Sequence, residues 1–341
     1  MKNIVCNVRN TQGITTGVQR YTSEIIRRIS NDIDLIKPRT NFSGIKGHIW
    51  EQSLLPLRLK GRLLWSPANT GPLFIKNHVV SIMDMSPIDH PEWSSKKFSD
   101  WYSFMIPRLI KNSKAIITIS EFSKSRIIAH YPEAHHKIFV THLAADDRFQ
   151  KKNIKVNIDK LNLPSKNYIL ALGSIEPRKN LNLLLRAWQS IVNSIPKDIY
   201  LVISGSSSNQ KVFGKYNLNE IPPRVHFTGY IDDDELPNLY SNAIALTYTP
   251  FYEGFGLPPL EAMSCGTPVI TSNTTSIPEV VGSAAIKINP LRVHECSEAI
   301  LEVINNKNLR KKMSTDGLKR SSLFNWQDTA NKTLEILQKA L

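Results

Sequence analysis

Residues 253–261, EGFGLPPLE, place two carboxylates, Glu253 and Glu261, at the ends of a loop that contains two glycines and two prolines. Carboxylate oxygens accept hydrogen bonds from the paired hydroxyls of a sugar or a ribose, and the uncovered amides of the glycines suit an anionic group. Because proline is tolerated in the first turn of a helix, we expect a helix to begin here with Glu261 in that turn, near the positive end of the helix dipole. The alternative is an ordinary turn before a helix, but both features in one loop favour a ligand site.

A second candidate site follows the apolar run YILALG (168–173), in the sequence SIEPRKNL (174–181). Arg178 and Lys179 could hold a diphosphate there, the arginine by its planar fork and the lysine as a point charge. Asn180 is placed to cap the helix that follows. On these residues alone, a solvated basic turn is an equally good interpretation.

Two other motifs are weaker evidence for a ligand site. Gly13 and Gly17 lie in NTQGITTGVQRY, which lacks the GxGxxG spacing of a dinucleotide site, so a nicotinamide cofactor is not supported. Glycines before a helix still let the backbone approach an anion, although a plain turn explains them better. The run Asp232-Asp233-Asp234 resembles a metal-binding DxD, but it precedes a predicted helix, where acidic residues cap the helix and complement its dipole.

The C-terminal half alternates short apolar runs with helical patterns. We expect strands at 168–173, 200–205, 225–229, 244–250, 269–272 and 284–288 and helices at 181–192, 234–243, 260–265 and 295–306. Strands that alternate with helices predict crossover units and a parallel sheet covered on both faces.

The N-terminal half follows the same pattern less clearly. We expect strands at 3–8, 78–84 and 115–120, and a helix at 15–30 with Val18, Tyr21, Ile25 and Ile29 on its buried stripe. The polar, lysine-rich stretch 149–167 carries no core residues in this interpretation, and the tail from Leu309 forms two helices. The prediction divides the chain into an N-terminal Rossmann-like acceptor domain (1–150), a linker (151–166), a C-terminal Rossmann-like donor domain (167–324) and a final helix (325–341) that packs back towards the N-terminal domain.

Composition excludes several classes of protein. The chain has 341 residues, 41% hydrophobic and 21% charged, as in a soluble globular protein of two domains. No apolar run is long enough to span a membrane, and MKNIVCNVRNTQG lacks the apolar core of a secretory signal. Cys6, Cys265 and Cys296 are odd in number and far apart, which suits buried thiols in a reducing cytosol.

The net charge of +14 permits anionic partners, but without nucleic-acid motifs we expect no nucleic acid. Basic residues among apolar ones at 54–65 and 101–114 suit an anionic lipid surface or, equally, a solvated helix face.

The stretch EGFGLPPLEAMSCGTPVI resembles the E-x7-E signature of the family 4 retaining glycosyltransferases. The resemblance extends over nearly the whole chain and in the expected order, through GVQRY (17–21), ITISEFSKSRI (117–127), SIEPRKNL, FTGYIDDDELPNLYSNA (227–243) and SIPEVVG (276–282). It implies an α/β chain of the GT-B fold, in which two doubly wound Rossmann-like domains face each other across a cleft. The form EPRKN and the stretch SIMDMSPIDHPEW (81–93) are similar to the mannosyltransferases that build bacterial O-antigen and capsule chains.

The resemblance also implies roles for individual residues. Arg178 and Lys179 would hold the nucleotide diphosphate, Glu261 the ribose hydroxyls, and Glu253 the donor sugar. The implied donor-binding set is completed by Gly17, Gly173, Ser174, Gly205, Gly229, Tyr230, Gly254, Phe255, Gly256 and Leu257. Among these, the backbone at Gly229 and Tyr230 would contact the base, Gly17 would approach the phosphates, and the amides from Gly254 to Leu257 would help to hold the sugar.

The sequence departs from the family at one position. Where the family often has His-Asp at a strand end, this chain has Met83-Asp84. Either Asp84 or a neighbouring residue takes the polar role of the histidine, or the sugar pocket is altered at this point. The expected catalytic set is Arg178, Lys179, Glu253 and Asp84.

The resemblance implies a retaining glycosyltransferase that needs no metal or other cofactor. The expected donor is GDP-mannose, with GDP-fucose, dTDP-rhamnose or a UDP-sugar as alternatives. The expected acceptor is an anionic lipid-linked glycan in lipopolysaccharide O-antigen or capsule synthesis, at the cytoplasmic face of the inner membrane. A non-catalytic scaffold subunit with the same fold is the other alternative.

Overall fold

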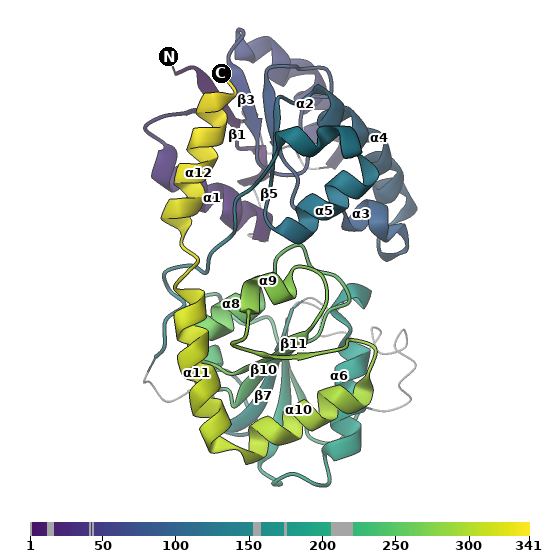
Figure 1. Ribbon diagram of the computed structural model, residues 1–341, viewed down its shortest axis with the longest axis vertical. Coiled ribbons are helices and arrows are strands. Elements are labelled where there is room, and N and C mark those ends of the chain that lie inside the picture. The colour runs from purple at the N-terminus through teal and green to yellow at the C-terminus, as the bar shows by residue number, and fades with distance from the viewer. Residues whose placement is uncertain are drawn as a thin grey trace. The chain divides into compact units, whose positions relative to one another are not determined.

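The computed structural model describes residues 2–11, 17–40, 42, 44–152, 158–173, 176–205 and 221–341. The chain divides into two compact units, which are described separately. Unit 1 contains Met1–Leu143 and Asn325–Leu341, and unit 2 contains Ala144–Phe324 (Figure 1). Each unit is built on a six-stranded sheet whose strand pairs are all parallel. The predicted α/β class with two parallel sheets is therefore confirmed.

Unit 1 has the strand order β2-β1-β3-β4-β5-β6. Its strands are β1 (Ile4–Asn7), β2 (Asp34–Ile36), β3 (Leu63–Ser66), β4 (His78–Ser81), β5 (Ala115–Thr118) and β6 (Ile138–Val140). Its helices are α1 (Gly17–Ile29), α2 (Gly44–Leu59), α3 (Ser86–Asp89), α4 (Lys96–Asn112), α5 (Glu121–His130) and α12 (Trp326–Lys339), with short 3-10 turns at Arg9–Thr11, Pro91–Trp93 and Pro132–Lys137. The predictions of β1, β4, β5 and α1 are confirmed, whereas β2, β3 and β6 were not predicted.

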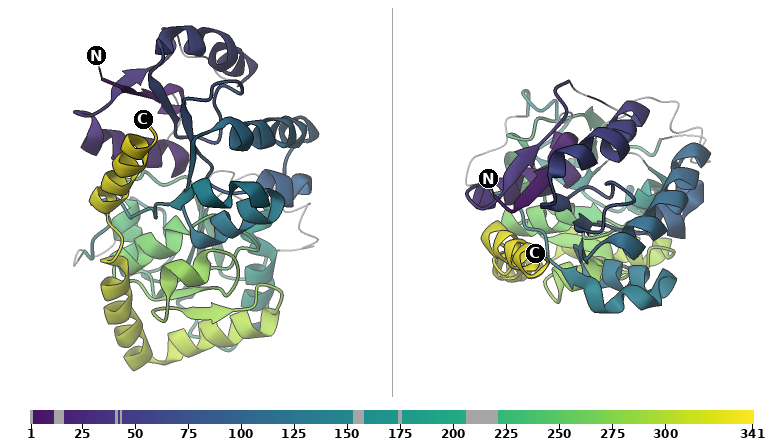
Figure 2. Two further views of the ribbon diagram at one scale, coloured as in Figure 1. Left: turned by 45° about the horizontal axis from the view of Figure 1, so that its top comes forward. Right: turned by 90° about the horizontal axis from the view of Figure 1, so that it is seen from above.

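The last helix, α12, lies against α1 within unit 1 (Figures 1 and 2). Asn325 caps it, because its side chain accepts a hydrogen bond from the backbone of Asp328 at 2.8 Å. Trp326 and Leu337 are buried on its inner side. Thr329 also donates a hydrogen bond to the backbone carbonyl of His142 at 2.6 Å, which fixes the start of α12 beside the end of the preceding unit 1 segment.

Unit 2 has the strand order β12-β11-β10-β7-β8-β9. Its strands are β7 (Asn167–Leu172), β8 (Ile199–Ser204), β9 (Val225–Gly229), β10 (Ala245–Tyr248), β11 (Val269–Ser272) and β12 (Ile286–Ile288), all of which were predicted. Its helices are α6 (Leu181–Ile191), α7 (Leu236–Asn242), α8 (Leu257–Ser264), α9 (Ile277–Val281), α10 (Val293–Asn305) and α11 (Lys307–Ser321), with a 3-10 turn at Pro177–Lys179. The direction of winding reverses between β7 and β10, and ligands of such sheets bind at the carboxyl ends of the strands at this point.

The segment expected to act as a linker, 151–166, lies partly outside the described residues, at 153–157. Its described part belongs to unit 2. The expectation that 149–167 carries no core residues is wrong, because Phe149, Leu161 and Leu163 are buried.

The three cysteines are buried, as expected, and each is a free thiol. Burial raises the pKa of Cys265 and of Cys296 to about 12. Among the described residues, no helix is both long enough and apolar enough to cross a bilayer.

A buried histidine at the start of β4 makes the stability of the protein depend on pH. His78 is fully buried, and its Nε2 lies 2.9 Å from the hydroxyl of Ser66. Burial lowers the pKa of His78 to about 4, although the charge of Glu51 opposes the shift. The imidazole of His78 takes up a proton at about pH 6.5 in the unfolded chain but only near pH 4 in the folded chain. The free energy of unfolding therefore decreases as the pH falls from 6.5 towards 4.

We expect the burial of His78 to lower the free energy of unfolding by about 2 kcal/mol when the pH falls from roughly 7.5 to roughly 5. Urea unfolding at the two pH values measures it, with His78→Gln removing this part of the pH dependence. His294→Gln, at an exposed position on α10, is the matched control. Equal pH dependence in all three proteins would contradict the prediction.

Candidate active site

The loops that follow β7 and β10 meet at the point where the winding of the unit 2 sheet reverses. These strands are direct neighbours, since Ala245 pairs with Ile169. The backbone amide of Phe251 donates to the carbonyl of Arg178 at 2.8 Å and ties the loops together. Residues far apart in the sequence are thereby held at one edge of the sheet.

Contrary to the prediction, Asn180 does not cap the following helix through its side chain but connects three loops. It precedes α6 in the left-handed conformation (φ 56°), and its side chain makes no capping hydrogen bond. Its amide nitrogen instead donates to the carbonyls of Thr249 (3.1 Å) and Pro290 (2.8 Å). Asn180 is buried, so these bonds satisfy its amide and join the loops after β7, β10 and β12.

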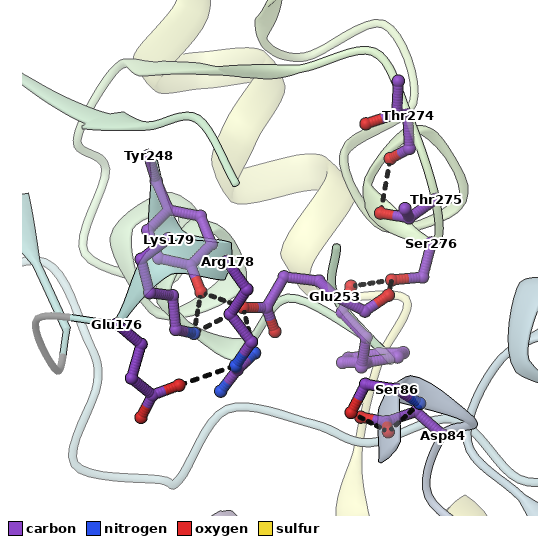
Figure 3. Close-up of polar contacts among 11 residues, drawn as sticks. Asp84, Ser86, Glu176, Arg178, Lys179, Tyr248, Glu253, Thr274, Thr275 and Ser276 are labelled. Carbon is purple, nitrogen blue, oxygen red and sulfur yellow. Dashed lines mark hydrogen bonds and ion pairs between the residues drawn. The ribbon is translucent and has the colours of Figure 1, made fainter. Parts of the chain in front are cut away.

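The two predicted cations and the first glutamate of EGFGLPPLE form one cluster (Figure 3). Arg178 Nη1 lies 2.9 Å from Glu253 Oε1, and Lys179 Nζ forms an ion pair with the same oxygen. Arg178 also bonds Glu176 Oε2 through Nε at 2.7 Å. The structure thus brings together three residues that the sequence assigned to two separate motifs.

Charge and burial act in opposite directions on this cluster. Burial alone would raise the pKa of Glu253, but the charges of Lys179 and Arg178 and the hydrogen bonds from Lys179 and Tyr248 hold that pKa below its usual range. Burial lowers the pKa of Lys179, and Arg178 lowers it further against the pull of Glu253. An additional anion would favour the charged form of Lys179, so the cluster is suited to a ligand such as a diphosphate.

Tyr248, the last residue of β10, completes the cluster and was missed by the sequence analysis. Its hydroxyl accepts a hydrogen bond from Lys179 and donates one to Glu253 Oε1 at 2.6 Å. Gly173 adjoins this cluster: a Cβ built on Gly173 would lie 3.9 Å from the side chains of both Lys179 and Tyr248. The signal that could have found Tyr248 is its place: a hydroxyl at the carboxyl end of a fully buried strand, five residues before Glu253.

Replacing Tyr248 with phenylalanine is expected to lower turnover about tenfold and to reduce the free energy of unfolding by about 2 kcal/mol, because it removes a buried hydrogen bond to a charged group. Tyr168→Phe is the matched control. Its buried hydroxyl donates to the carbonyl of Leu239 at 2.7 Å, away from the cluster. The control should lose stability and keep turnover; equal loss of turnover in both variants would refute a specific role for Tyr248.

The loop EGFGLPPLE is held by contacts of its own. Ser276 Oγ lies 2.8 Å from the carbonyls of both Glu253 and Phe255, to which it is hydrogen-bonded. Gly256 precedes α8 with φ 113°, and a Cβ there would lie 2.7 Å from the side chain of Ile277, so only glycine fits. The two prolines lie in the first turn of α8, as predicted, and Leu257 begins the helix.

Glu261 lies elsewhere than predicted. It is the fifth residue of α8 and so belongs to the second turn, because the helix begins at Leu257. Its carboxylate is buried, and Oε2 accepts a hydrogen bond from the hydroxyl of Tyr240 at 3.1 Å. Tyr240, on α7, was also missed. Nothing in the sequence pairs it with Glu261, because the contact joins two helices.

Three of the predicted glycines line the carboxyl edge of neighbouring strands. The amide of Gly173 donates to the carbonyl of Ser204 and the amide of Gly205 to that of Gly229, each at 3.0 Å. A Cβ on Gly205 would lie 2.0 Å from the carbonyl oxygen of Gly173, so these backbones touch. This edge presents backbone in place of side chains. Gly254 lies buried in the loop before α8, Tyr230 is exposed beyond β9, and Ser174 lies outside the described residues.

The remaining predicted residues lie in unit 1. Gly17 begins α1. Asp84 follows β4, and its Oδ1 accepts hydrogen bonds from the amide (2.9 Å) and the hydroxyl (2.7 Å) of Ser86, as drawn in Figure 3. Met83, where the family often has histidine, is buried.

The acidic run Asp232-Asp233-Asp234 does not cap α7 as predicted. The residue preceding that helix is Glu235, and no side-chain capping bond forms. Asp234 pairs instead with Arg148 at 3.0 Å, and Glu235 pairs with Lys160. The carboxylates of this segment are thus partly neutralised by cations of the same unit.

Solved structures share this architecture over nearly its whole length. The chain matches sucrose-phosphate synthase from Thermosynechococcus elongatus with a TM-score of 0.77 (16% identity; 99% of each chain). It matches WaaG, a glycosyltransferase involved in lipopolysaccharide biosynthesis, with a TM-score of 0.76 (15% identity; 98% of this chain and 99% of that chain). The chain therefore has the GT-B fold that these two enzymes share.

Sequence comparison identifies the family. The family model described as Glycosyl transferases group 1 matches residues 153–320. The O-antigen chain mannosyltransferase B of Escherichia coli is 33% identical over 276 residues, which cover 77% of this chain and 72% of that protein. The serotype-specific mannosyltransferase WbdA of Escherichia coli is 28% identical over 68% of this chain, which spans only 29% of that longer protein. The chain belongs to the group 1 glycosyl transferase family, as the sequence analysis inferred.

Proposed function

We propose that this glycosyltransferase moves mannose from GDP-mannose to a lipid-linked glycan acceptor, with retention at the anomeric carbon and without a metal. The proposed product is a bacterial surface polysaccharide, either the O-antigen of lipopolysaccharide or a capsule. The mannosyl and O-antigen assignments are supported by the names of the relatives above and by that of the O-antigen chain mannosyltransferase RfbU of Salmonella typhimurium, 28% identical over 67% of this chain. The proposed location is the cytoplasmic face of the inner membrane, with the protein bound peripherally.

The observation that carries the proposal is the convergence of Arg178 and Lys179 on one oxygen of Glu253. In the proposed reaction the two cations hold the donor diphosphate and stabilise the charge that develops as it leaves, which is the role a metal plays in other transferases. Glu253 then turns to the hydroxyls of the sugar, assisted by the amides from Gly254 to Leu257. Glu261 accepts the ribose hydroxyls.

The other proposed contacts involve backbone and unit 1. The backbone of Gly229 and Tyr230 contacts the base, and the exposed position of Tyr230 suits this role. Gly17 is proposed to approach the phosphates. Asp84 is proposed as the polar group near the donor sugar, in place of the histidine that Met83 replaces.

A thermal-shift screen against GDP, UDP, CDP, ADP and dTDP, in buffer with a metal chelator, tests the donor. A ligand at a hundred times its dissociation constant stabilises the folded state by about 2.7 kcal/mol. A shift with GDP alone supports the mannosyl assignment. A shift with UDP or dTDP instead overturns mannose and retains the transferase.

Absence of any shift would support the second candidate, a non-catalytic scaffold of the same fold. The observation that favours this candidate is Met83 at the position of the family histidine. Incubation of GDP-mannose with lipid-linked acceptor in the presence of chelator then tests turnover, metal independence and retention together, through the anomeric configuration of the product.

A further inference from the structure

Helix α2 of unit 1 is apolar on two sides. Its inner side buries Trp50 and Leu55. Its outer side carries Ile45, Ile49 and Leu57, which are 79%, 59% and 78% exposed. At 3.6 residues per turn these three side chains fall within an arc of about 120° on the outer side of the helix. Apolar side chains on both sides of a helix are suited to an apolar environment on each, and the described part of the chain covers only the inner side.

The apolar surface continues from α2 through the loop before β4. Gln52 of α2 donates to the carbonyl of Gly71 and accepts from the amide of Leu73, both at 2.9 Å. From the other side, Asn112 of α4 donates to the carbonyl of Leu73 at 2.7 Å. Phe74, the next residue, is 82% exposed. These bonds tie the loop between β3 and β4, which carries Phe74, to both α2 and α4.

Helix α4 extends the same surface. His48 of α2 contacts the ring of Trp101 at 5.1 Å, and Trp101 stacks on Phe104 at 5.8 Å. The guanidinium of Arg108 lies 3.7 Å from the centre of the exposed Phe104 ring. We name the outward apolar residues the α2–α4 surface; its members are Ile45, Ile49, Leu57, Phe74 and Phe104.

Charges around the α2–α4 surface are almost all positive. Residues 44–62, 71–77 and 101–114 contain eight basic residues, namely Lys46, Arg58, Lys60, Arg62, Lys76, Arg108, Lys111 and Lys114. The one acidic residue in these segments, Glu51, is buried and paired with Arg9 at 3.1 Å. The rest of α4 adds Lys96, Lys97 and one exposed acidic residue, Asp100, which pairs with Lys96 at 2.9 Å. Arg62 pairs with Asp34 at 2.8 Å. Exposed apolar side chains bordered mainly by cations match the composition of an interfacial membrane-binding surface.

We propose that the α2–α4 surface docks on an anionic lipid bilayer, with its apolar side chains inserted at the headgroup boundary and its cations against lipid phosphates. This inference deepens the proposed function, on which it rests for the lipid-linked acceptor, by naming the part of the protein that contacts the membrane. A second copy of the chain is a poorer occupant, because a two-fold contact through this surface would bring the same cations together.

Vesicle co-sedimentation with purified full-length protein tests the proposal. The vesicles contain phosphatidylcholine alone or with roughly 30% phosphatidylglycerol. We expect binding to the anionic vesicles only, and an approximately tenfold or larger fall in the partition coefficient for Ile49→Gln/Leu57→Gln. Leu291→Gln is the matched control, since Leu291 is 74% exposed in unit 2, and it should bind as the wild type does.

A charge control separates a local surface from general basicity. Lys46→Glu/Lys111→Glu should weaken vesicle binding, whereas Lys311→Glu/Lys312→Glu, at exposed positions on α11, should not. Equal weakening by both pairs would overturn the proposal in favour of diffuse attraction by net charge. The membrane-docking proposal would also be overturned if the wild-type protein did not bind anionic vesicles, or if Ile49→Gln/Leu57→Gln bound them as the wild type does. It would likewise be overturned if Ile49→Gln/Leu57→Gln abolished a dimer in analytical ultracentrifugation.

No donor or acceptor is present in this experiment, so its result is independent of the nucleotide screen. Vesicle binding without a nucleotide shift would support the surface and count against the proposed reaction. A nucleotide shift without vesicle binding would support nucleotide binding by the proposed transferase and count against membrane docking by the α2–α4 surface.

Discussion

Replacing Lys179 with methionine is expected to lower the rate of sugar transfer by about a hundredfold to a thousandfold while the protein stays folded. The ammonium group lies beside Glu253 and Tyr248, at the edge where β7 and β10 end. Loss of one group that stabilises developing charge in a water-poor site has an effect of about this size. Methionine keeps most of the length of the side chain, so packing around the aliphatic part of Lys179 is largely preserved.

The measurement is the initial rate of transfer to the acceptor, with far-ultraviolet circular dichroism and thermal unfolding as tests of folding. Lys160→Met is the control, because Lys160 is an exposed lysine of the same unit that also pairs with a glutamate, Glu235. The control should keep wild-type turnover. If Lys179→Met retained more than about a tenth of the activity, Lys179 would not have the proposed electrostatic role.

Replacing Glu253 with glutamine is expected to have opposite effects on nucleotide affinity and on turnover. In the structure, Oε1 of Glu253 receives Arg178 at 2.9 Å, Tyr248 at 2.6 Å and the ammonium of Lys179. Under the proposed function, this oxygen therefore competes with the donor diphosphate for the same cations. Glutamine removes the competing charge, so GDP alone should bind about tenfold more tightly. Turnover should fall about a hundredfold or more, because the carboxylate that is proposed to hold the sugar is lost.

Stability provides a second measurement for the same variant. Removing the anion leaves Lys179 without its carboxylate partner beside Arg178, at half-buried positions, which costs about 3 kcal/mol in the free protein. Saturating GDP should restore much of that loss, because its diphosphate supplies the missing negative charge. Glu176→Gln is the matched control: Glu176 also bonds Arg178 but is more exposed, so smaller changes are expected. Weaker GDP binding by Glu253→Gln than by wild type would contradict the interpretation.

The sequence was sufficient for the features that are local in the chain. The strands of unit 2 each show as a short buried run, and the prolines of EGFGLPPLE mark the start of α8 correctly. Glycine and charge at the strand ends identified both halves of the cluster. The strands β2 and β6 were missed; each has only three residues at the edge of a sheet, with at most one of them buried. The strand β12 is equally short and also at an edge, but the apolar run AAIKI (284–288) predicted it.

Contacts between distant segments could not be predicted in the same way. Asn180 bonds the loops after β10 and β12, a role that depends on which strands are neighbours and not on the residues beside it. The bond from Tyr248 to Glu253 likewise requires the loop after β10 to fold back on its own strand. Glu261 was placed one turn too early because the position at which a helix begins depends on the conformation of Gly256.

The membership of α12 in unit 1 means that unit 2 is an uninterrupted insertion, residues 144–324, in a host whose sequence is split. The hydrogen bond from Thr329 to the carbonyl of His142 shows that the two cut ends of the host lie next to each other. A gene fragment for 144–324 therefore encodes one complete unit. The host can be rebuilt as a single chain by splicing a few glycine and serine codons between Leu143 and Asn325. A stop codon at 325, by contrast, would remove a helix from the host and leave the insertion complete.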